Sequence, residues 1–307
     1  MLKTISRKKP KEREVRLLKK LLKKVGFKDI IIDESFDYET EKYIIEFQKK
    51  NKIKANGIIK DKTWGALMKE GLNIEYRQFY KLELGGRIQY YILKIPRNDY
   101  KTDILKELFP NGKHKYIDLR NFDRDIKINA TFFKDSYDKQ GKMWISPTGY
   151  TKIDGRFSNY GGFPLYQLCV DTGEIGLLED KKNNMEKKCN NIISGTPLLV
   201  YKGKKSSSFE THIEEISKRN PRMSYGNNDK FHIIVVADGR EKMIRRTGAY
   251  YSTIADFFIK EKAERAIGLD GGKSAQLWIL NELISESWSQ RSTAVGLGWN
   301  QITQNQP

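Results

Sequence analysis

The sequence has few of the residues that build disulfide scaffolds, dedicated metal sites or membrane spans. Its 307 residues include two cysteines, Cys169 and Cys189, and three histidines. The cysteine spacing fits neither a disulfide framework nor a zinc motif, so we expect two free thiols. The histidines lack the His-x-x-x-His spacing of a histidine-rich metal site. No apolar run reaches the roughly 18 residues of a membrane-spanning helix, and the basic N-terminus lacks the apolar segment of a secretory signal peptide.

Positive charge is abundant. The formal net charge is +18, from 57 Lys and Arg against 39 Asp and Glu, and the first residues are especially basic. One interpretation is a solvated, lysine-rich surface. The other is attraction to a polyanion, either nucleic acid or an anionic cell-wall polymer. Charge alone does not separate these interpretations.

Residues 12–70 carry the pattern of three short helices. Asp37 is a plausible N-cap for the second helix, and the third helix packs Trp64 inward and ends at Gly71. Asn56-Gly57 is a strong turn signal between them. The first helix has apolar residues at helical spacing and stops at Gly26; these residues are Val15, Leu18, Leu21, Leu22 and Val25.

This segment resembles the peptidoglycan-binding module of cell-wall hydrolases. The resemblance implies binding to wall glycan or stem peptide, although such a module can also serve as a spacer or a protein-docking unit. The matching residues are Phe47-Gln48, Asn56-Gly57-Ile58, Thr63-Trp64 and Leu67.

From about residue 76, short apolar segments alternate with turn residues and read as strands. One clear helix is expected in YSTIADFFIKEKAERA and a second in KTDILKELF. Many strands with few helices indicate an α+β fold, in which a small three-helix module precedes a larger domain with a mixed or antiparallel sheet. We expect a basic tail at 1–11, the module at 12–75 and a catalytic domain at 76–307.

The stretch LDGGKSAQLWI contains Gly-Gly-Lys-Ser but is not a phosphate-binding loop. That loop needs a first glycine at position 267, which is Ile267, and a following helix, whereas AQLWIL reads as a strand. Asp270 instead ends an apolar strand at a turn of two glycines. Glycines let the backbone approach a ligand closely and aim N–H groups at an anion.

The order of segments resembles the phosphodiester glycosidase family over roughly residues 85–300. Two departures bear on the site, because the family usually reads NGGFF where this chain has NATFF, and DGGGSS where it has DGGKSA. Pocket shape and substrate are therefore expected to differ, and loss of activity is an alternative. The matching pieces are NATFF from Asn129, SGTPLLV from Ser194, PRMSYG from Pro221, VVADGR from Val235, LDGGKS from Leu269 and QRSTA from Gln290.

The resemblance implies cleavage of a sugar from a phosphodiester at the anomeric carbon. Such a reaction needs positive charge at the phosphate and a carboxylate at the developing sugar cation or its attacking water. Asp270 is the first choice for the carboxylate, Asp238 the second, and Asn129 would orient a hydroxyl or phosphate oxygen. The expected substrate-binding residues are Arg222, Arg291, Arg240, Thr131, Gly271, Gly272, Lys273 and Ser274. No cofactor is required, although the two aspartates could share a divalent cation.

The two modules together suggest a wall glycopolymer, such as the linkage unit of teichoic acid, as substrate. The expected partner is cell-wall glycan or a sugar-phosphate polymer, with nucleic acid unlikely and no membrane span. Alternatives are a non-catalytic wall-binding protein and a basic nucleic-acid or nucleotide binder. Without a signal peptide, we expect cytoplasmic synthesis and action at the wall, as a phage-associated or lysis-released protein; a sporulation role is an alternative.

Overall fold

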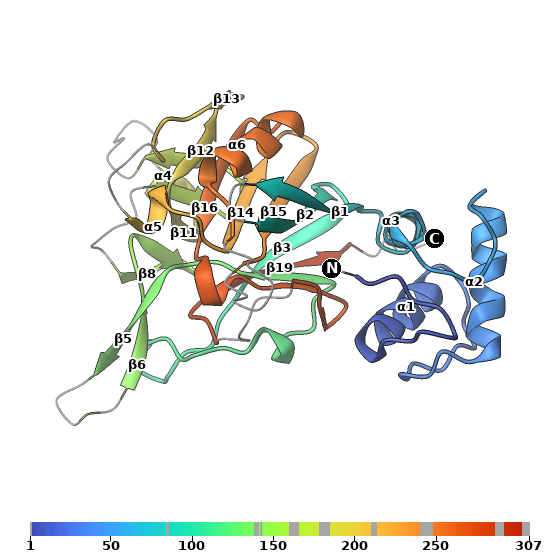
Figure 1. Cartoon of the computed structure of the whole chain (residues 1–307). Coiled ribbons are helices and arrows are strands. Elements are labelled where there is room, and N and C mark those ends of the chain that lie inside the picture. Colours follow the sequence, from blue (N-terminus) through green and yellow to red (C-terminus); the bar gives the residue numbers. More distant parts are fainter. Residues whose placement is uncertain are drawn as a thin grey trace.

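The structure is a computed structural model that describes residues 2–83, 86–137, 141, 143–159, 166–177, 185–209, 214–239, 248–285 and 292–302. Three helices form a small module beside a larger, sheet-rich body (Figure 1). This arrangement confirms the predicted α+β class.

The module consists of α1 (Glu12–Lys24), α2 (Tyr38–Lys50) and α3 (Asp61–Leu72). The Asp37 carboxylate accepts a hydrogen bond from the Thr40 amide at 2.7 Å, so the predicted N-cap is confirmed. α3 extends one residue beyond the predicted end at Gly71. Asn73 then takes a left-handed conformation, with φ of 50°, and turns the chain into the first strand.

The side chain of Gln48 holds the Asn-Gly turn of the module in place. Its side-chain oxygen accepts hydrogen bonds from the Asn56 and Gly57 amides at 3.0 Å, and its amide nitrogen donates to the Ile58 carbonyl at 2.9 Å. The side chain is fully buried. A single side chain therefore closes the turn that links α2 to α3.

The first residues, expected as a basic tail, pack against the module. Leu2 and Ile5 are buried, and Ile5 exchanges two backbone hydrogen bonds with Ile59. The side-chain amide of Gln78 both accepts from the Leu2 amide and donates to the Leu2 carbonyl. The N-terminus thus lies against the junction between module and body.

The largest sheet of the body has seven strands, all paired antiparallel. Helix α6 (Tyr251–Lys260) covers one face, where Ile254 and Phe258 join an apolar cluster with Val235 and Ala266. The strand order is β1 (Glu75–Glu83), β2 (Gly86–Pro96), β15 (Phe231–Ala237), β14 (Arg222–Asn227), β16 (Arg265–Leu269), β12 (Leu198–Tyr201) and β13 (Lys204–Lys205).

Two five-stranded sheets and one hairpin complete the body, with the short helices α4 (Met185–Lys188) and α5 (Glu214–Ser217). The first sheet runs β10 (Ile175–Leu177), β9 (Tyr166–Cys169), β11 (Ile192–Gly195), β7 (Thr151–Ile153) and β8 (Arg156–Asn159). The second runs β18 (Glu282–Leu283), β17 (Leu277–Ile279), β4 (Ile126–Asn129), β19 (Gly296–Gln301) and β3 (Tyr100–Leu105), and the hairpin pairs β5 (Phe133–Tyr137) with β6 (Met143–Pro147).

Two predicted helices differ from the structure. The segment KTDILKELF was predicted as a helix and is wrong, because Tyr100–Leu105 forms β3 and pairs along its whole length with β19. Tertiary pairing outweighs the weak local helix preference there. α6 is shorter than predicted, since Lys262 has a φ of 59° and the chain enters β16 at Arg265.

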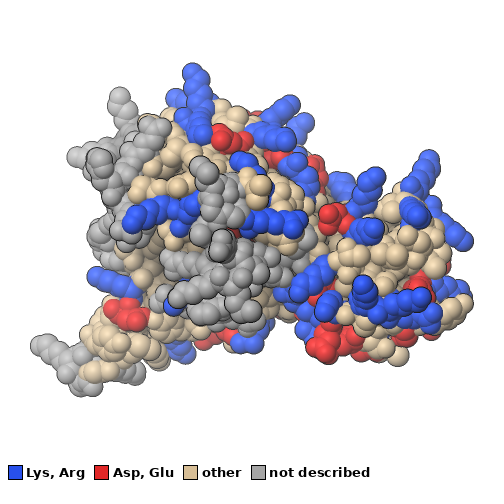
Figure 2. Space-filling view, viewed as in Figure 1, with Lys and Arg blue, Asp and Glu red and all other residues tan. Residues whose placement is uncertain are grey.

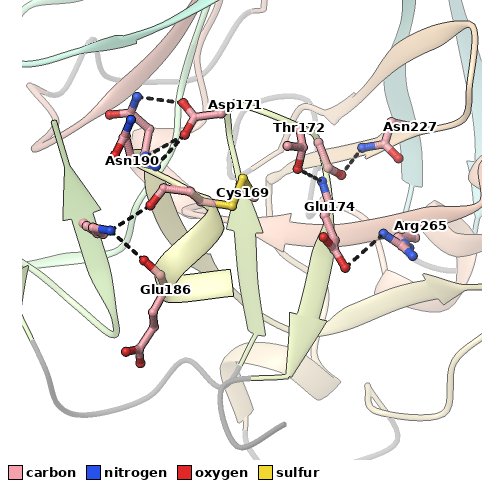
Figure 3. The surroundings of a disulfide bond; sticks show 12 residues. Cys169, Asp171, Thr172, Glu174, Glu186, Asn190, Asn227 and Arg265 are labelled. Atoms are coloured by element: carbon pink, nitrogen blue, oxygen red, sulfur yellow. Dashed lines mark hydrogen bonds and ion pairs between the residues drawn. A yellow bond between two sulfur atoms is a disulfide. The ribbon is translucent and has the colours of Figure 1, made fainter. Parts of the chain in front are cut away.

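The prediction of two free thiols is also wrong, because Cys169 and Cys189 form a disulfide bond (Figure 3). Both cysteines are buried. Cys169 ends β9 and is paired with Ile192 of β11. Cys189 follows α4 and precedes Ile192 by three residues, so it lies next to Cys169. Sequence spacing carried no sign of this pairing, since the contact depends on how β9 and β11 align.

The module is fixed to the body by charged groups on one face of α1. Glu282, a buried carboxylate on β18, accepts hydrogen bonds from Arg16 at 3.1 Å and from Lys20 at 2.7 Å. Lys24 pairs with Asp125 at 3.0 Å. One apolar core also continues from Leu2 through the helices into the sheets.

The excess of positive charge is spread out. On the face drawn in Figure 2, Lys and Arg side chains are scattered over both module and body, with Asp and Glu between them. No single basic stripe appears on this face. Within the described residues, no helix is long and apolar enough to cross a membrane.

Candidate active site

Three predicted site residues lie at the same end of three neighbouring interior strands of the seven-stranded sheet. Asp238 follows the last residue of β15, Asp270 follows the last residue of β16, and Arg222 begins β14 between them. Because β14 runs antiparallel to both neighbours, its first residue meets their last residues. The two aspartates are separated by two strand spacings, about 10 Å between backbones.

Asn129 holds the backbone of Asp270 in place. Its amide nitrogen donates to the Asp270 carbonyl at 2.5 Å, and its side-chain oxygen accepts from the Gln276 amide at 2.9 Å. The Asp270 amide donates to the Ala130 carbonyl at 2.9 Å. Asn129 is fully buried. The end of β4 and the end of β16 are thereby joined, although the two strands belong to different sheets.

The Gly271-Gly272 turn packs tightly against the start of β14. A Cβ on Gly271 would lie 2.6 Å from the Pro221 carbonyl oxygen, so a side chain there would clash with backbone. Gly272 has a φ of 59° and donates its amide to the same carbonyl at 2.8 Å. The two glycines are therefore required by packing as well as by turn geometry. Lys273 is exposed and Ser274 is buried in the short 3-10 turn that follows.

Arg222 is a buried cation stacked on an aromatic ring. Its guanidinium lies 3.8 Å from the centre of the Tyr251 ring. It donates hydrogen bonds to three backbone carbonyls, those of Ala249, Ile216 and Lys218. The side chain is 4% exposed. Arg222 thus anchors the segments that flank the start of α6.

Tyr251 connects this cation with the candidate carboxylate. Burial raises the pKa of the Tyr251 hydroxyl, the charge and hydrogen bond of Arg222 lower it, and the negative charge of Asp270 raises it. Its hydroxyl also lies 3.4 Å from the Thr196 carbonyl oxygen. Arg222, Tyr251 and Asp270 therefore form one electrostatic cluster, in which the two charges act on the phenol in opposite directions.

Asp238 occupies a different setting. It is 1% exposed, accepts a hydrogen bond from the Tyr91 hydroxyl at 2.8 Å, and donates its amide to the Gln89 carbonyl at 3.0 Å. Along β15, Val236 belongs to the inner apolar core, and alternation along a strand puts Asp238 on that same face. Arg222 points instead toward α6. Asp238 and Arg222 therefore lie on opposite faces of the sheet.

The remaining predicted residues divide into two groups. Thr131 is fully buried, and its hydroxyl oxygen has no hydrogen-bond partner among the residues that the structure describes. A buried hydroxyl without a partner is rare in folded proteins and is often associated with function. Arg240 and Arg291 lie outside the described residues, so the structure places neither.

Comparison with known proteins gives this site a family. A family model described as phosphodiester glycosidase matches residues 123–299, more than half of the chain. The chain belongs to the phosphodiester glycosidase family. The matched region contains Asn129, Arg222, Asp238 and Asp270. A peptidoglycan-binding-domain model matches residues 11–67, the segment that forms the three helices of the module.

Solved structures share the fold of this glycosidase. The catalytic domain of zebrafish N-acetylglucosamine-1-phosphodiester alpha-N-acetylglucosaminidase, auto-inhibited by its pro-peptide, superposes with a TM-score of 0.56 at 19% identity, covering 75% of this chain and 84% of that one. A hypothetical protein from Synechocystis superposes with a TM-score of 0.52 at 13% identity, covering 75% and 62%. None of the curated proteins matches the chain significantly.

Sequence reasoning overlooked two residues near the site, Tyr251 and Gly195. Tyr251 was treated as part of a helix, and its stacking on Arg222 depends on the α6–sheet contact. Gly195 is another, because a Cβ there would lie 2.4 Å from the Gly268 carbonyl oxygen, where β11 crosses β16. The available sequence signal for Tyr251 was its place at the start of the predicted helix, three residues after Gly248.

The divalent cation shared by Asp238 and Asp270 stays a prediction. Among the described residues, no group of three or more His, Cys, Asp or Glu side chains is close enough to hold a metal ion. A cation shared by Asp238 and Asp270 would need both carboxylates turned to the same side.

Proposed function

We propose that this phosphodiester glycosidase hydrolyses sugar-1-phosphodiester bonds in a cell-wall glycopolymer, such as the linkage unit of teichoic acid. The observation that carries the proposal is a peptidoglycan-binding module fixed by ion pairs and a continuous apolar core to a glycosidase body. Binding the wall through the module raises the local concentration of linkages near the body.

The chemistry of the site supports bond cleavage at the anomeric carbon. In this proposal, the Asp270 carboxylate activates the attacking water or stabilises the developing sugar cation. Asn129 acts as a positioning residue, since it fixes the Asp270 backbone through a hydrogen bond of 2.5 Å. Phosphate is a good leaving group, so strong acid assistance is less necessary than for an ordinary glycoside.

Positive charge is the second requirement of this reaction. Arg222 supplies a buried cation beside Asp270, and a buried charge acts more strongly than an exposed one. Lys273 is exposed on the turn directly after Asp270 and can approach a phosphate from the solvent side. We assign the phosphate of the substrate to this side of the turn, with Arg240 and Arg291 as further candidates.

The disulfide supports a place of action outside the reducing cytoplasm. Disulfides persist in oxidising surroundings and are rare in cytosolic proteins. A buried Cys169–Cys189 bond therefore fits a protein that works at the wall after export, release at lysis or assembly into a phage particle.

The test uses purified cell walls. Native protein is incubated with teichoic-acid-bearing walls and with walls stripped of the polymer, and released phosphate-containing polymer is measured. We expect release only from the intact walls, and a loss of at least about a hundredfold with Asp270→Asn. Asp229→Asn is the matched control, because Asp229 is exposed in the turn at the opposite end of β15.

Two results would contradict the proposal. Equal release by the native protein and Asp270→Asn would show that cleavage does not need the Asp270 carboxylate. Wall binding without any release, by both proteins, would favour a non-catalytic wall-binding role.

A further inference from the structure

A pocket away from the candidate active site is lined by residues from the segments 106–114 and 153–157, the second of which leads into β8. Its volume is about 770 Å³, within the range typical of small-molecule sites. The residues that carry the argument are Lys106, Phe109, His114, Asp154, Arg156 and Phe157.

The pocket and the Asp270 edge lie at opposite ends of β7 and β11. At the end toward Asp270, the Thr196 amide donates to the Gly268 carbonyl, and the Ser194 hydroxyl donates to the Tyr150 carbonyl at 2.5 Å. Asp154 follows Tyr150 by four residues, roughly 13 Å of extended chain. The pocket is therefore a separate site.

Its charged groups leave one cation available. Lys106 and Asp154 form an ion pair across the mouth, which neutralises both. Arg156 is exposed at the start of β8, and no carboxylate among the described residues pairs with it. A guanidinium in this setting can bind two oxygens of a carboxylate or phosphate at once.

His114 supplies an unused polar group. The residue is 3% exposed, and within the described part of the chain its Nδ1 atom has no hydrogen-bond partner. Its backbone is held by bridges to Leu108 and Ile145, which places the residue in the pocket wall. Burial and the charge of Lys106 lower the His114 pKa to about 4, which keeps the imidazole neutral at neutral pH. A neutral imidazole can both donate to and accept from hydroxyl groups.

Two aromatic rings complete the lining. Phe109 is half-buried beneath the ammonium group of Lys115, and Phe157 packs edge-on against Tyr150 with ring centres 5.0 Å apart. Lys152 also lies over the Phe157 ring, with its Nζ 5.5 Å from the ring centre, so a sugar would pack its C–H groups against the apolar surface that the neighbours of both rings leave to the pocket. Apolar walls with a few fixed polar groups are the usual composition of a ligand site.

We propose that this pocket binds an anionic sugar unit, through Arg156 for the charged group, His114 for a hydroxyl and Phe109 and Phe157 for the ring. The inference rests on the proposed function, since it assigns the pocket to a second unit of the same wall polymer. The anionic group is either the carboxylate of a muramic-acid unit or the phosphate of a sugar phosphate.

The test reads binding at the pocket itself. Ile153 lines the pocket, so its δ1-methyl NMR signal reports occupancy there. The protein is titrated with N-acetylmuramic acid, N-acetylglucosamine 1-phosphate and uncharged N-acetylglucosamine. We expect the Ile153 signal to shift with at least one of the two anionic sugars. Arg156→Gln should weaken that binding about tenfold and leave N-acetylglucosamine unaffected, and Phe109→Ala should weaken all binding.

Arg87→Gln is the control, because Arg87 is an exposed arginine on β2 of another sheet. The two anionic sugars identify the source of the charge by their relative affinities. Hydrolysis of a small soluble sugar-1-phosphodiester, measured in parallel, depends on the Asp270 site alone.

The outcomes separate the two proposals. An Ile153 signal that no sugar shifts, or that shifts equally in Arg156→Gln, overturns the pocket assignment even when hydrolysis is intact. Loss of hydrolysis with normal Ile153 titration would instead count against the proposed function and leave the pocket as a saccharide site.

Discussion

At the scale of single residues, His232 is a buried histidine that the fold holds in its neutral form. Its Nδ1 atom lies 2.7 Å from the Tyr225 hydroxyl, and its Nε2 atom lies 3.3 Å from the Thr102 hydroxyl. Burial, with a smaller effect of the Arg97 charge, lowers the His232 pKa to about 3. Charging this ring therefore opposes folding.

The sign of the pH dependence follows from this shift. The unfolded chain takes up the His232 proton near pH 6.5, whereas the folded chain resists it down to about pH 3. Folding stability should consequently fall as pH decreases through this window, by up to about 1.4 kcal/mol per pH unit from this group. Urea unfolding at several pH values measures the slope. His232→Gln, which cannot titrate, should flatten it; an unchanged slope would contradict the assignment.

The contact between Asn129 and Asp270 shows how much of the site could be predicted from the sequence. The sequence predicted that Asn129 and Asp270 belong to one site, and the structure brings them into direct contact. It did not predict that the Asn129 amide contacts backbone rather than open space, because that depends on two sheets meeting at this point. For the same reason, the opposite facing of Asp238 and Arg222 could not be read from their separate motifs.

At the scale of elements, the disulfide fastens the segment between β9 and β11. Asp171 reinforces this loop by accepting hydrogen bonds from the Asn190 and Asn191 amides at 2.7 and 3.0 Å, and Lys152 donates to the Glu186 and Cys189 carbonyls (Figure 3). The residues next to β9 and β11 are therefore joined by the covalent bond and by hydrogen bonds.

Removing the covalent bond should lower stability without abolishing the fold. Closing a loop with a sequence separation of 20 contributes about 3 kcal/mol in the chain-entropy description. We expect Cys169→Ser with Cys189→Ser, or treatment of the native protein with a reductant, to lower the thermal midpoint. The double variant should be insensitive to reductant. A double variant with the native thermal midpoint would contradict this contribution.

Elements with strong local signals were predicted well. α1 and α2 have clear apolar periodicity or a capping residue, and the apolar runs that became β15 and β16 are typical of buried strands. β3 was mistaken for a helix because its few apolar residues do not alternate cleanly, and only its pairing with β19 makes it a strand. Sheet order likewise depends on contacts between distant segments, which composition and spacing do not encode.

At the scale of the whole molecule, Glu282 holds the module to the body. It is 4% exposed and receives hydrogen bonds from both Arg16 and Lys20 of α1. Hydrogen bonds to a charged group contribute more than neutral ones, so Glu282→Gln should destabilise the junction by about 2 kcal/mol. Limited proteolysis near residue 74 should become faster in this variant.

Glu34→Gln is the control for this change. Glu34 pairs with the same Arg16 side chain, but it is exposed and belongs to the module alone. Exposed ion pairs contribute little. Similar proteolysis rates for the native protein and Glu282→Gln would indicate that the apolar core alone fixes the junction.

The fixed junction has a consequence for work on an insoluble surface. Because α1 fixes the module to the body, the body cannot move freely while the module is bound. Each bound molecule would therefore reach only the linkages next to its binding position. Progress over a sacculus would then require detachment and landing elsewhere. At low coverage of the proposed wall substrate, the rate of dissociation and rebinding, rather than the rate of bond cleavage, would limit the overall rate of hydrolysis.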